Sequence, residues 1–89
     1  MTFDDLEFRP HGLHKGGEHA ELMLGNRYSV SVIRTPFSYG GREGLYELAV
    51  LRKDAKGRLR IIGGDVYGYL KPDGVTSLIR QVELRENIG

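Results

Sequence analysis

Three histidines near the start of the chain have the side chains best suited to hold a metal ion: His11, His14 and His19. Imidazole nitrogens are common zinc ligands, and a loop that folds back could bring three rings to one ion. Their spacing matches no established ligand pattern, however, and the chain has no cysteine to complete a structural site. Only Glu18 or Glu21 could supply a fourth ligand. We therefore predict solvated loop histidines, with no metal site and no cofactor.

The residue types used in nucleophilic and acid–base catalysis occur without the sequence context that catalysis needs. None of the serines lies in the sharp strand-to-helix motif that exposes a nucleophile. Asp4 and Asp5 are neighbours, so on a strand their carboxylates would point to opposite faces and could not share a proton or a metal. A chain of 89 residues also rarely encloses a pocket that holds a catalytic triad. We predict that the protein is not an enzyme.

A glycine-rich segment, residues 36–44, combines aromatic and charged side chains. It lacks the lysine followed by serine or threonine of a phosphate-binding loop, and it precedes a strand-like run rather than a helix. Aromatic and arginine side chains are enriched at the hot spots of protein interfaces. The segment is therefore either a plain connection with unusual backbone angles or a contact loop. Its candidate partner-binding residues are Phe37, Tyr39, Arg42 and Glu43.

A second candidate surface is a run of basic residues that contains one acid, Asp54. Residues 54–57 are typical of a tight turn, which would fold two short strands together and gather the charges at one tip. Such a tip could contact phosphates or an acidic protein surface, or it could be a solvated face of the hairpin. The candidate residues are Arg52, Lys53, Lys56, Arg58 and Arg60.

Most of the chain should form a sheet that positions these residues, because apolar and polar residues alternate along it as far as Lys71. Residues 25–26, Gly-Asn, tolerate positive φ and should join the second and third strands as a hairpin. The fourth strand has apolar side chains on both faces, which predicts a central strand covered on both sides. The expected strands are residues 4–9, 18–24, 28–34, 45–51 and 58–62.

Two breaks and a helix complete the expected topology. Pro10 should end the first strand, and the glycine pair at 63–64 should end the fifth, with 65–70 as a short extended connection. Beyond this the apolar spacing becomes helical, which predicts a helix over 72–84 whose stripe packs on the sheet. The predicted fold class is therefore α+β, an antiparallel sheet of about five strands with one C-terminal amphipathic helix packed on one face. The stripe is Val75, Leu78, Ile79 and Val82.

Composition limits the chain to one small domain. With 89 residues, 39% hydrophobic and 28% charged, it has the mix of an ordinary folded protein and a thin core, which is compatible with a homodimer. The net charge is +1, so bulk charge predicts neither a nucleic-acid binder nor a membrane binder. No apolar run approaches the ~20 residues of a membrane span, and the acidic N-terminus lacks a secretory signal. Because the chain has no cysteine, we expect a cytoplasmic location.

A family resemblance runs through nearly the whole chain. It is carried by residues 3–11, 28–32, 38–51 and 68–70, of which 38–51, SYGGREGLYELAVL, is the most specific part. These stretches resemble a family of small proteins encoded by tailed phages and prophages. The resemblance implies a phage protein that acts in a bacterial host cell, and it assigns no catalytic residues. Small phage proteins without enzymatic activity often bind a host protein and inhibit or redirect it, as anti-CRISPR proteins do with immune effectors.

We therefore expect a small protein that binds and modulates or inhibits a host protein, with residues 37–43 and 52–60 as its contact surface. Two alternatives stay open: an accessory protein that binds nucleic acid, and a minor virion or assembly component. Affinity for nucleic acid would fall steeply with salt. A virion component would self-associate through an exposed sheet edge.

Overall fold

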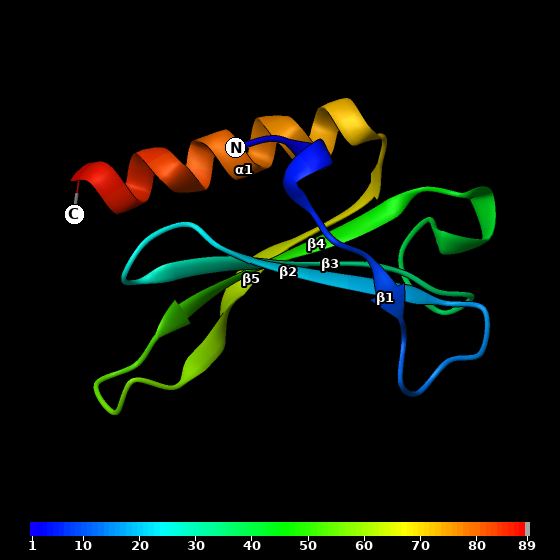
Figure 1. The fold of residues 1–89 in the computed structure, drawn as a ribbon, viewed down its shortest axis with the longest axis horizontal. Helices are drawn as coiled ribbons and strands as arrows, with labels where there is room; N and C mark the ends of the chain where they lie inside the picture. The colour runs from blue at the N-terminus through cyan, green and yellow to red at the C-terminus, as the bar shows by residue number, and fades with distance from the viewer. Residues whose placement is uncertain (89) are drawn as a thin grey trace.

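A computed structural model describes residues 1–88, which form one antiparallel sheet of five strands with one long helix across a single face (Figure 1). Each strand pairs with the next one in the chain, so the sheet is a meander. The predicted α+β fold class is therefore confirmed. The strands are β1 (Arg9–Pro10), β2 (Glu18–Met23), β3 (Tyr28–Arg34), β4 (Tyr46–Lys53) and β5 (Leu59–Leu70). The helices are α1 (Pro72–Ile88) and two short 3-10 helices, η1 (Phe3–Asp5) and η2 (Gly41–Glu43).

The hairpin of β2 and β3 forms as the sequence predicts. Its ladder puts the buried apolar residues of both strands on one face of the sheet. In the turn, the Leu24 N–H donates to the Tyr28 carbonyl at 3.0 Å. Gly25 has a φ of 157°, and a Cβ there would lie 2.3 Å from Glu86 Cγ. The turn therefore needs glycine because the end of α1 packs directly on it.

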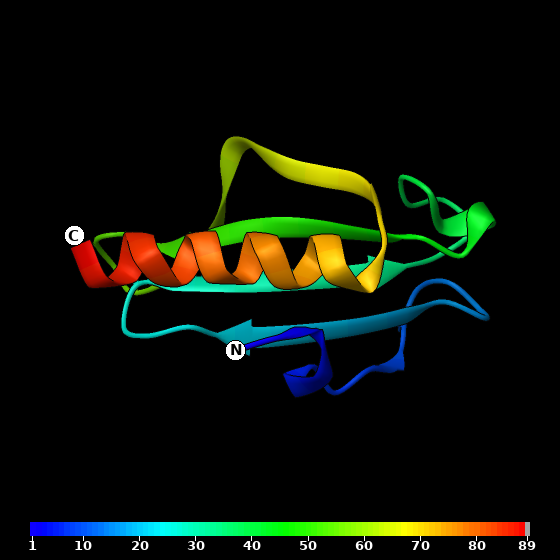
Figure 2. The same ribbon diagram turned by 90° about the horizontal axis from the view of Figure 1, so that it is seen from above.

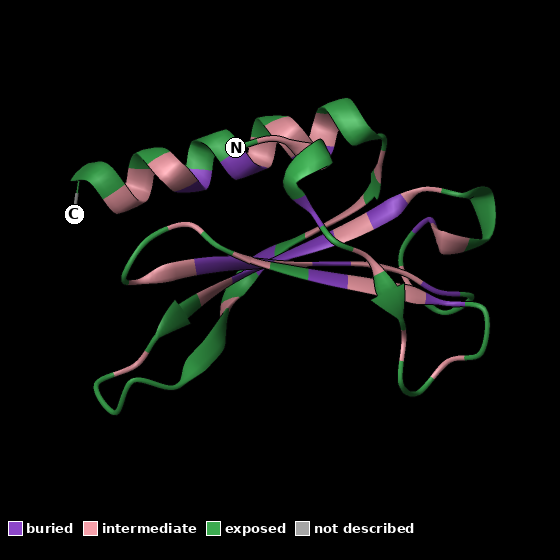
Figure 3. Cartoon of the chain, in the orientation of Figure 1, coloured by how far each residue is buried: buried purple, intermediate pink, exposed green. Residues whose placement is uncertain are grey.

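The core lies between α1 and one face of the sheet, where Figure 3 shows the buried residues concentrated. Figure 2 shows α1 running along the sheet over β3 and β4. Val75, Ile79 and Val82 of the predicted stripe are each at most 1% exposed. Each contributes roughly 1.5–3 kcal/mol through burial. The sheet residues at most 1% exposed in this core are Val30, Val32, Leu48 and Val50.

The opposite face of the sheet has no covering element within residues 1–88 (Figure 1). The prediction that the fourth strand is covered on both sides is therefore wrong. Ala49 is only 9% exposed because its side chain is short and neighbouring strands flank it, whereas Leu51 on the same face is partly exposed. Apolar residues on both faces of a strand thus do not require a second covering layer.

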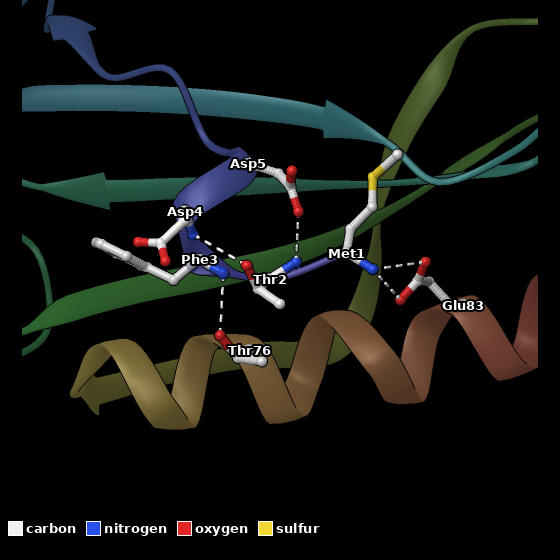
Figure 4. A network of polar contacts seen from close by, with 7 residues as sticks. All are labelled: Met1, Thr2, Phe3, Asp4, Asp5, Thr76 and Glu83. Carbon is white, nitrogen blue, oxygen red and sulfur yellow. Dashed lines mark hydrogen bonds and ion pairs between the residues drawn. The ribbon is translucent and has the colours of Figure 1, made fainter.

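Residues 4–9 do not form the predicted strand. Their first residues form η1, in which the Thr2 hydroxyl accepts the Asp4 N–H at 3.3 Å and the Asp5 carboxylate accepts the Thr2 N–H at 2.7 Å (Figure 4). These side chains satisfy the backbone of the turn and so compete with sheet pairing. Pro10 is the last residue of β1, so the strand ends there as predicted, and the edge position of β1 tolerates the missing donor.

The N-terminal segment is held against α1 (Figure 4). The Phe3 N–H donates to Thr76 Oγ1 at 2.9 Å, and the amino group of Met1 lies 2.9 Å from Glu83 Oε1. The Phe3 ring packs edge-on against the Tyr46 ring, with 5.1 Å between centroids. This segment therefore links the helix to β4 and closes one side of the core.

Strand β5 continues through the glycine pair at which its end was predicted. The pairs Leu51–Ile61 and Ala49–Val66 leave residues 62–65 of β5 opposite a single residue of β4. Extra residues in one strand form a bulge and bend it. Figure 2 shows β5 bowing away from β4 at this point. The prediction of a break is wrong because the glycines mark a bulge within one strand.

Helix α1 runs past its predicted end at residue 84. Its last turns make polar contacts that the apolar spacing does not report. Arg85 Nη1 donates to Asp65 Oδ2 at 2.6 Å, and Glu86 Oε1 accepts the backbone N–H of Tyr28 at 2.8 Å. These contacts with the β5 bulge and the β2–β3 turn hold the last turns of the helix.

Truncation of Ile79 tests how much the helix–sheet contact stabilises the fold. We expect Ile79→Ala to lower the free energy of unfolding by about 2–5 kcal/mol, because it removes buried methyl groups and leaves a cavity. Urea denaturation followed by circular dichroism measures the change. Leu84→Ala is the matched control on the same helix, because Leu84 is 59% exposed. It should change stability by no more than about 0.5 kcal/mol, and an equal loss in both variants would contradict the packing.

A pH dependence is expected from the Asp65–Arg85 pair. The hydrogen bond from Arg85, aided by one from Tyr67 and opposed by burial, lowers the pKa of Asp65 below its usual range. The folded state thus binds fewer protons than the unfolded one, so this stabilisation is complete above about pH 5 and is lost as the pH falls through the folded pKa. Asp65→Asn should cost about 1 kcal/mol at neutral pH, since Arg85 is partly exposed. Urea denaturation from neutral to acidic pH should show that the difference in the free energy of unfolding between the two proteins becomes smaller. A difference that stays constant would contradict the pairing.

Candidate partner-binding surfaces

The connection between β3 and β4, residues 35–45, is a structured loop built on Thr35 and Ser38. Thr35 is 3% exposed, and its Oγ1 accepts the N–H groups of Phe37 at 3.1 Å and Ser38 at 3.0 Å. Ser38 Oγ accepts the Thr35 N–H at 2.9 Å and donates to the Thr35 carbonyl at 3.0 Å. Such side-chain contacts replace the backbone pairing that a strand or helix would provide. This β3–β4 loop is therefore held in its conformation by hydrogen bonds within the chain.

The β3–β4 loop also packs against the end of β5. The Tyr69 N–H donates to the Tyr39 carbonyl at 3.1 Å. A Cβ at Gly68 would lie 2.3 Å from Tyr39 Cβ, and a Cβ at Gly40 would lie 2.8 Å from Tyr69 Cα. Only glycine permits such close approach of two backbones. Tyr69 itself has a φ of 56°, a strained conformation for a tyrosine that the contact with the loop holds in place.

Three exposed aromatic side chains lie on the β3–β4 loop and on the end of β5 against which the loop packs. Phe37 is 74% exposed, Tyr39 63% and Tyr69 62%. Arg42 and Glu43 are also exposed, on η2 within the loop. We call these five residues the aromatic loop surface. The sequence predicted four of them as contact residues, and Tyr69 was not among its candidates.

The three histidines lie together beside the loop. The ring centroids of His11 and His14 are 5.0 Å apart, and those of His11 and His19 are 6.1 Å apart. The His14 ring lies 5.0 Å from the Phe37 ring. Among the residues that the structure describes, no three histidine, aspartate or glutamate side chains are placed to hold a metal ion. The visible role of His14 is to pack against Phe37.

The basic hairpin, residues 52–60, forms where β4 turns into β5. Asp54 organises its tip: Oδ1 accepts the N–H groups of Lys56 and Arg58, each at 2.9 Å. Asp54 Oδ2 lies 2.8 Å from Arg60 Nε and 3.4 Å from Arg58 Nε. The hydrogen bond from Arg60 is the main reason why the pKa of Asp54 lies below its usual range. The one acid of the hairpin thus holds two of its cations.

The other three cations of the hairpin have no acidic partner within residues 1–88: Arg52, Lys53 and Lys56. Arg52 lies over the face of the Tyr28 ring, with its guanidinium carbon 5.8 Å from the centroid. All three side chains are exposed. Their charges are therefore available to an anionic partner.

Strand β4 separates the aromatic loop surface from the basic hairpin. It runs from one to the other, and its eight residues span about 26 Å at ~3.3 Å per residue. Figure 1 shows the hairpin tip and the β3–β4 loop at opposite ends of the molecule. The structure therefore does not bring together the two sets that the sequence analysis combined in one contact surface. They are two separate surfaces.

Two surface hollows flank Arg34, one beside the β3–β4 loop and the other between β1 and the start of β2. Their volumes are about 370 and 440 Å³. Arg34 Nη2 lies 2.5 Å from Glu18 Oε1, so the positive charge between the hollows is largely offset. Neither hollow is lined by a serine or a histidine. These hollows therefore offer no nucleophile with an adjacent base of the kind that hydrolysis uses.

No protein-family model matches the chain, and comparisons with curated proteins and with solved structures found no match. The resemblance to small phage proteins therefore stays a prediction. Within residues 1–88, no helix has the length and apolar character required to cross a membrane.

A glycine substitution tests the docking of the β3–β4 loop on β5. We expect Gly68→Ala to displace the loop, because the new methyl group would lie 2.3 Å from Tyr39 Cβ. Amide hydrogen exchange by NMR should then show loss of protection at the Tyr69 N–H. Gly63→Ala is the matched control on the same strand, since a Cβ there meets nothing within 4 Å. Unchanged exchange in Gly68→Ala would contradict the close contact.

Proposed function

We propose that the protein is a non-enzymatic recognition domain that binds another protein and modulates or inhibits it. The observation that carries the proposal is the aromatic loop surface, where Phe37, Tyr39 and Tyr69 are exposed on a backbone fixed by hydrogen bonds. In the phage setting that the sequence resemblance implies, the partner is a bacterial host protein, with defence effectors as one candidate class.

Aromatic side chains on a rigid backbone suit this task for two reasons. They bury a large apolar area at a small cost in side-chain entropy, which is why they dominate interface hot spots. A loop that is ordered before binding also avoids the cost of ordering on association. Thr35 and Ser38 supply that order here, since their hydroxyls fix the turn that displays Phe37.

Binding to nucleic acid is the second candidate, and the basic hairpin favours it. Arg52, Lys53 and Lys56 have no acidic partner within the described chain and lie at the end remote from the aromatic loop surface. Contacts with phosphates would make affinity fall steeply with salt, by about 0.9 in log–log slope per phosphate. The two candidates therefore use different ends of the molecule and can be separated by mutation.

A pull-down from bacterial lysate, with and without nuclease, distinguishes the two candidates. The tag belongs at the carboxyl end, because the amino group of Met1 contacts Glu83. We expect a stoichiometric protein partner that survives nuclease. Phe37→Ala with Tyr39→Ala should weaken it at least tenfold in a binding titration with the purified partner, since hot-spot side chains contribute more than about 1 kcal/mol each.

The matched control reverses charge at the other end, in the double variant Lys53→Glu with Lys56→Glu. This control should leave protein binding unchanged if the aromatic loop surface is the contact site. If nuclease treatment removes all partners and the charge-reversed variant also fails to retain them, binding to nucleic acid becomes the favoured function. Circular dichroism of both double variants verifies that each is folded.

A further inference from the structure

The face of the sheet opposite α1, which we call the open face, is a second surface with binding character. No element covers it within residues 1–88. The register of the strands aligns Met23, Ser29, Leu51 and Ile61 in one row across β2 to β5 on this face. Met23 is 43% exposed and Ile61 59%. On this one face, the row thus exposes an apolar side chain of β2 and another of β5 to water.

The apolar character extends beyond that row. Val66 and Leu59 of β5 are 38% and 37% exposed, and their partners in the ladder put both on the open face. A short side chain, Ala49, lies on β4 directly opposite Val66. Exposed apolar side chains gathered on one face of a small domain typically mark an interaction site.

Charge on the open face is uneven along the strands. Glu47 lies toward the end that carries the β3–β4 loop, where its Oε1 also accepts the Tyr39 N–H. Glu21 lies one row nearer the centre, and Arg9 of β1 and His19 of β2 lie beside the two acids on the same face. Lys53 lies at the other end, next to the basic hairpin. A second copy turned about a two-fold axis perpendicular to the strands would place its basic end over the acidic end of the first. An axis parallel to the strands would instead place like charges together.

We propose that the open face is a self-association surface on which a second copy of this chain docks, with its strands running in the opposite direction. Two sheets packed face to face lie about 10 Å apart and interdigitate their side chains. An axis over Val50 puts Lys53 of one copy above Glu47 of the other. The same axis puts the large Leu51 above the small Ala49. The aromatic loop surface lies at the end of the sheet and not on the open face. Self-association is therefore a separate property from the proposed binding of a partner protein.

Sedimentation equilibrium over protein concentrations from about 1 μM to about 1 mM measures the association. We expect a reversible dimer that weakens with added salt. Met23→Glu and Ile61→Glu should each raise the dissociation constant at least tenfold, because each would bury an unpaired carboxylate. Leu13→Glu is the matched control, since Leu13 is 85% exposed in the β1–β2 connection and does not belong to the open face.

Charge exchange tests the direction of the second copy. Lys53→Glu should weaken the dimer, and addition of Glu47→Lys in the same chain should restore it. A monomer at every concentration would overturn the proposal. A dimer that Met23→Glu leaves intact would also overturn it, because a dimer formed by pairing of β5 edges does not involve β2. If the folded double variant does not regain the dimer affinity of the original protein, the antiparallel placement is wrong. An increase in dimer affinity with salt would also contradict it.

Discussion

The structure depends on α1 being held at one position over the sheet, since α1 and the N-terminal segment that docks on it cover the apolar face within residues 1–88. The valine and isoleucine stripe supplies the burial. Three polar residues of the second half of α1 add contacts to other segments of the chain. Glu83 contacts the amino group of Met1, Arg85 the carboxylate in the β5 bulge, and Glu86 the backbone of the β2–β3 turn. Because each reaches a different segment, a shift of the helix breaks all three.

Sequence patterns predicted the elements whose structure is determined locally. The bounds of β3 and the start of α1 agree with prediction, since strict alternation and helical spacing each report which face is buried. Some failures occurred where a local side-chain turn or a glycine bulge replaces the regular pattern, and others where distant residues decide. Residues 4–9 alternate like a strand, but Thr2 and Asp5 close a turn that docks on α1. The last turns of α1 are held by Arg85 and Glu86, whose partners are far away in the sequence.

Residue type identified most of the candidate surfaces, and topology then rearranged them. Phe37 and Tyr39 were predicted from their chemistry alone, whereas Tyr69 joins them only through a contact between segments 30 residues apart in the chain. Likewise, the cations of the basic hairpin were predicted, but not their distance from the loop. That distance follows from β4 being one uninterrupted strand. Residue type can thus predict candidate interface residues, while strand length and strand pairing decide which of them lie on the same surface.

The hydrogen bond between Phe3 and Thr76 joins residues 73 apart in sequence, while every strand pair in the meander joins neighbours. Local hairpins close small loops and form early, and contacts of long sequence separation form late. During synthesis on the ribosome, residues 1–8 cannot make these contacts until Thr76 and Glu83 of α1 have been synthesised. The Thr2–Asp5 turn is closed by its own side chains, so it can form before docking. It thereby reduces the conformational entropy that the segment loses when it docks on α1. The order of assembly therefore runs opposite to the order of translation at this edge of the core.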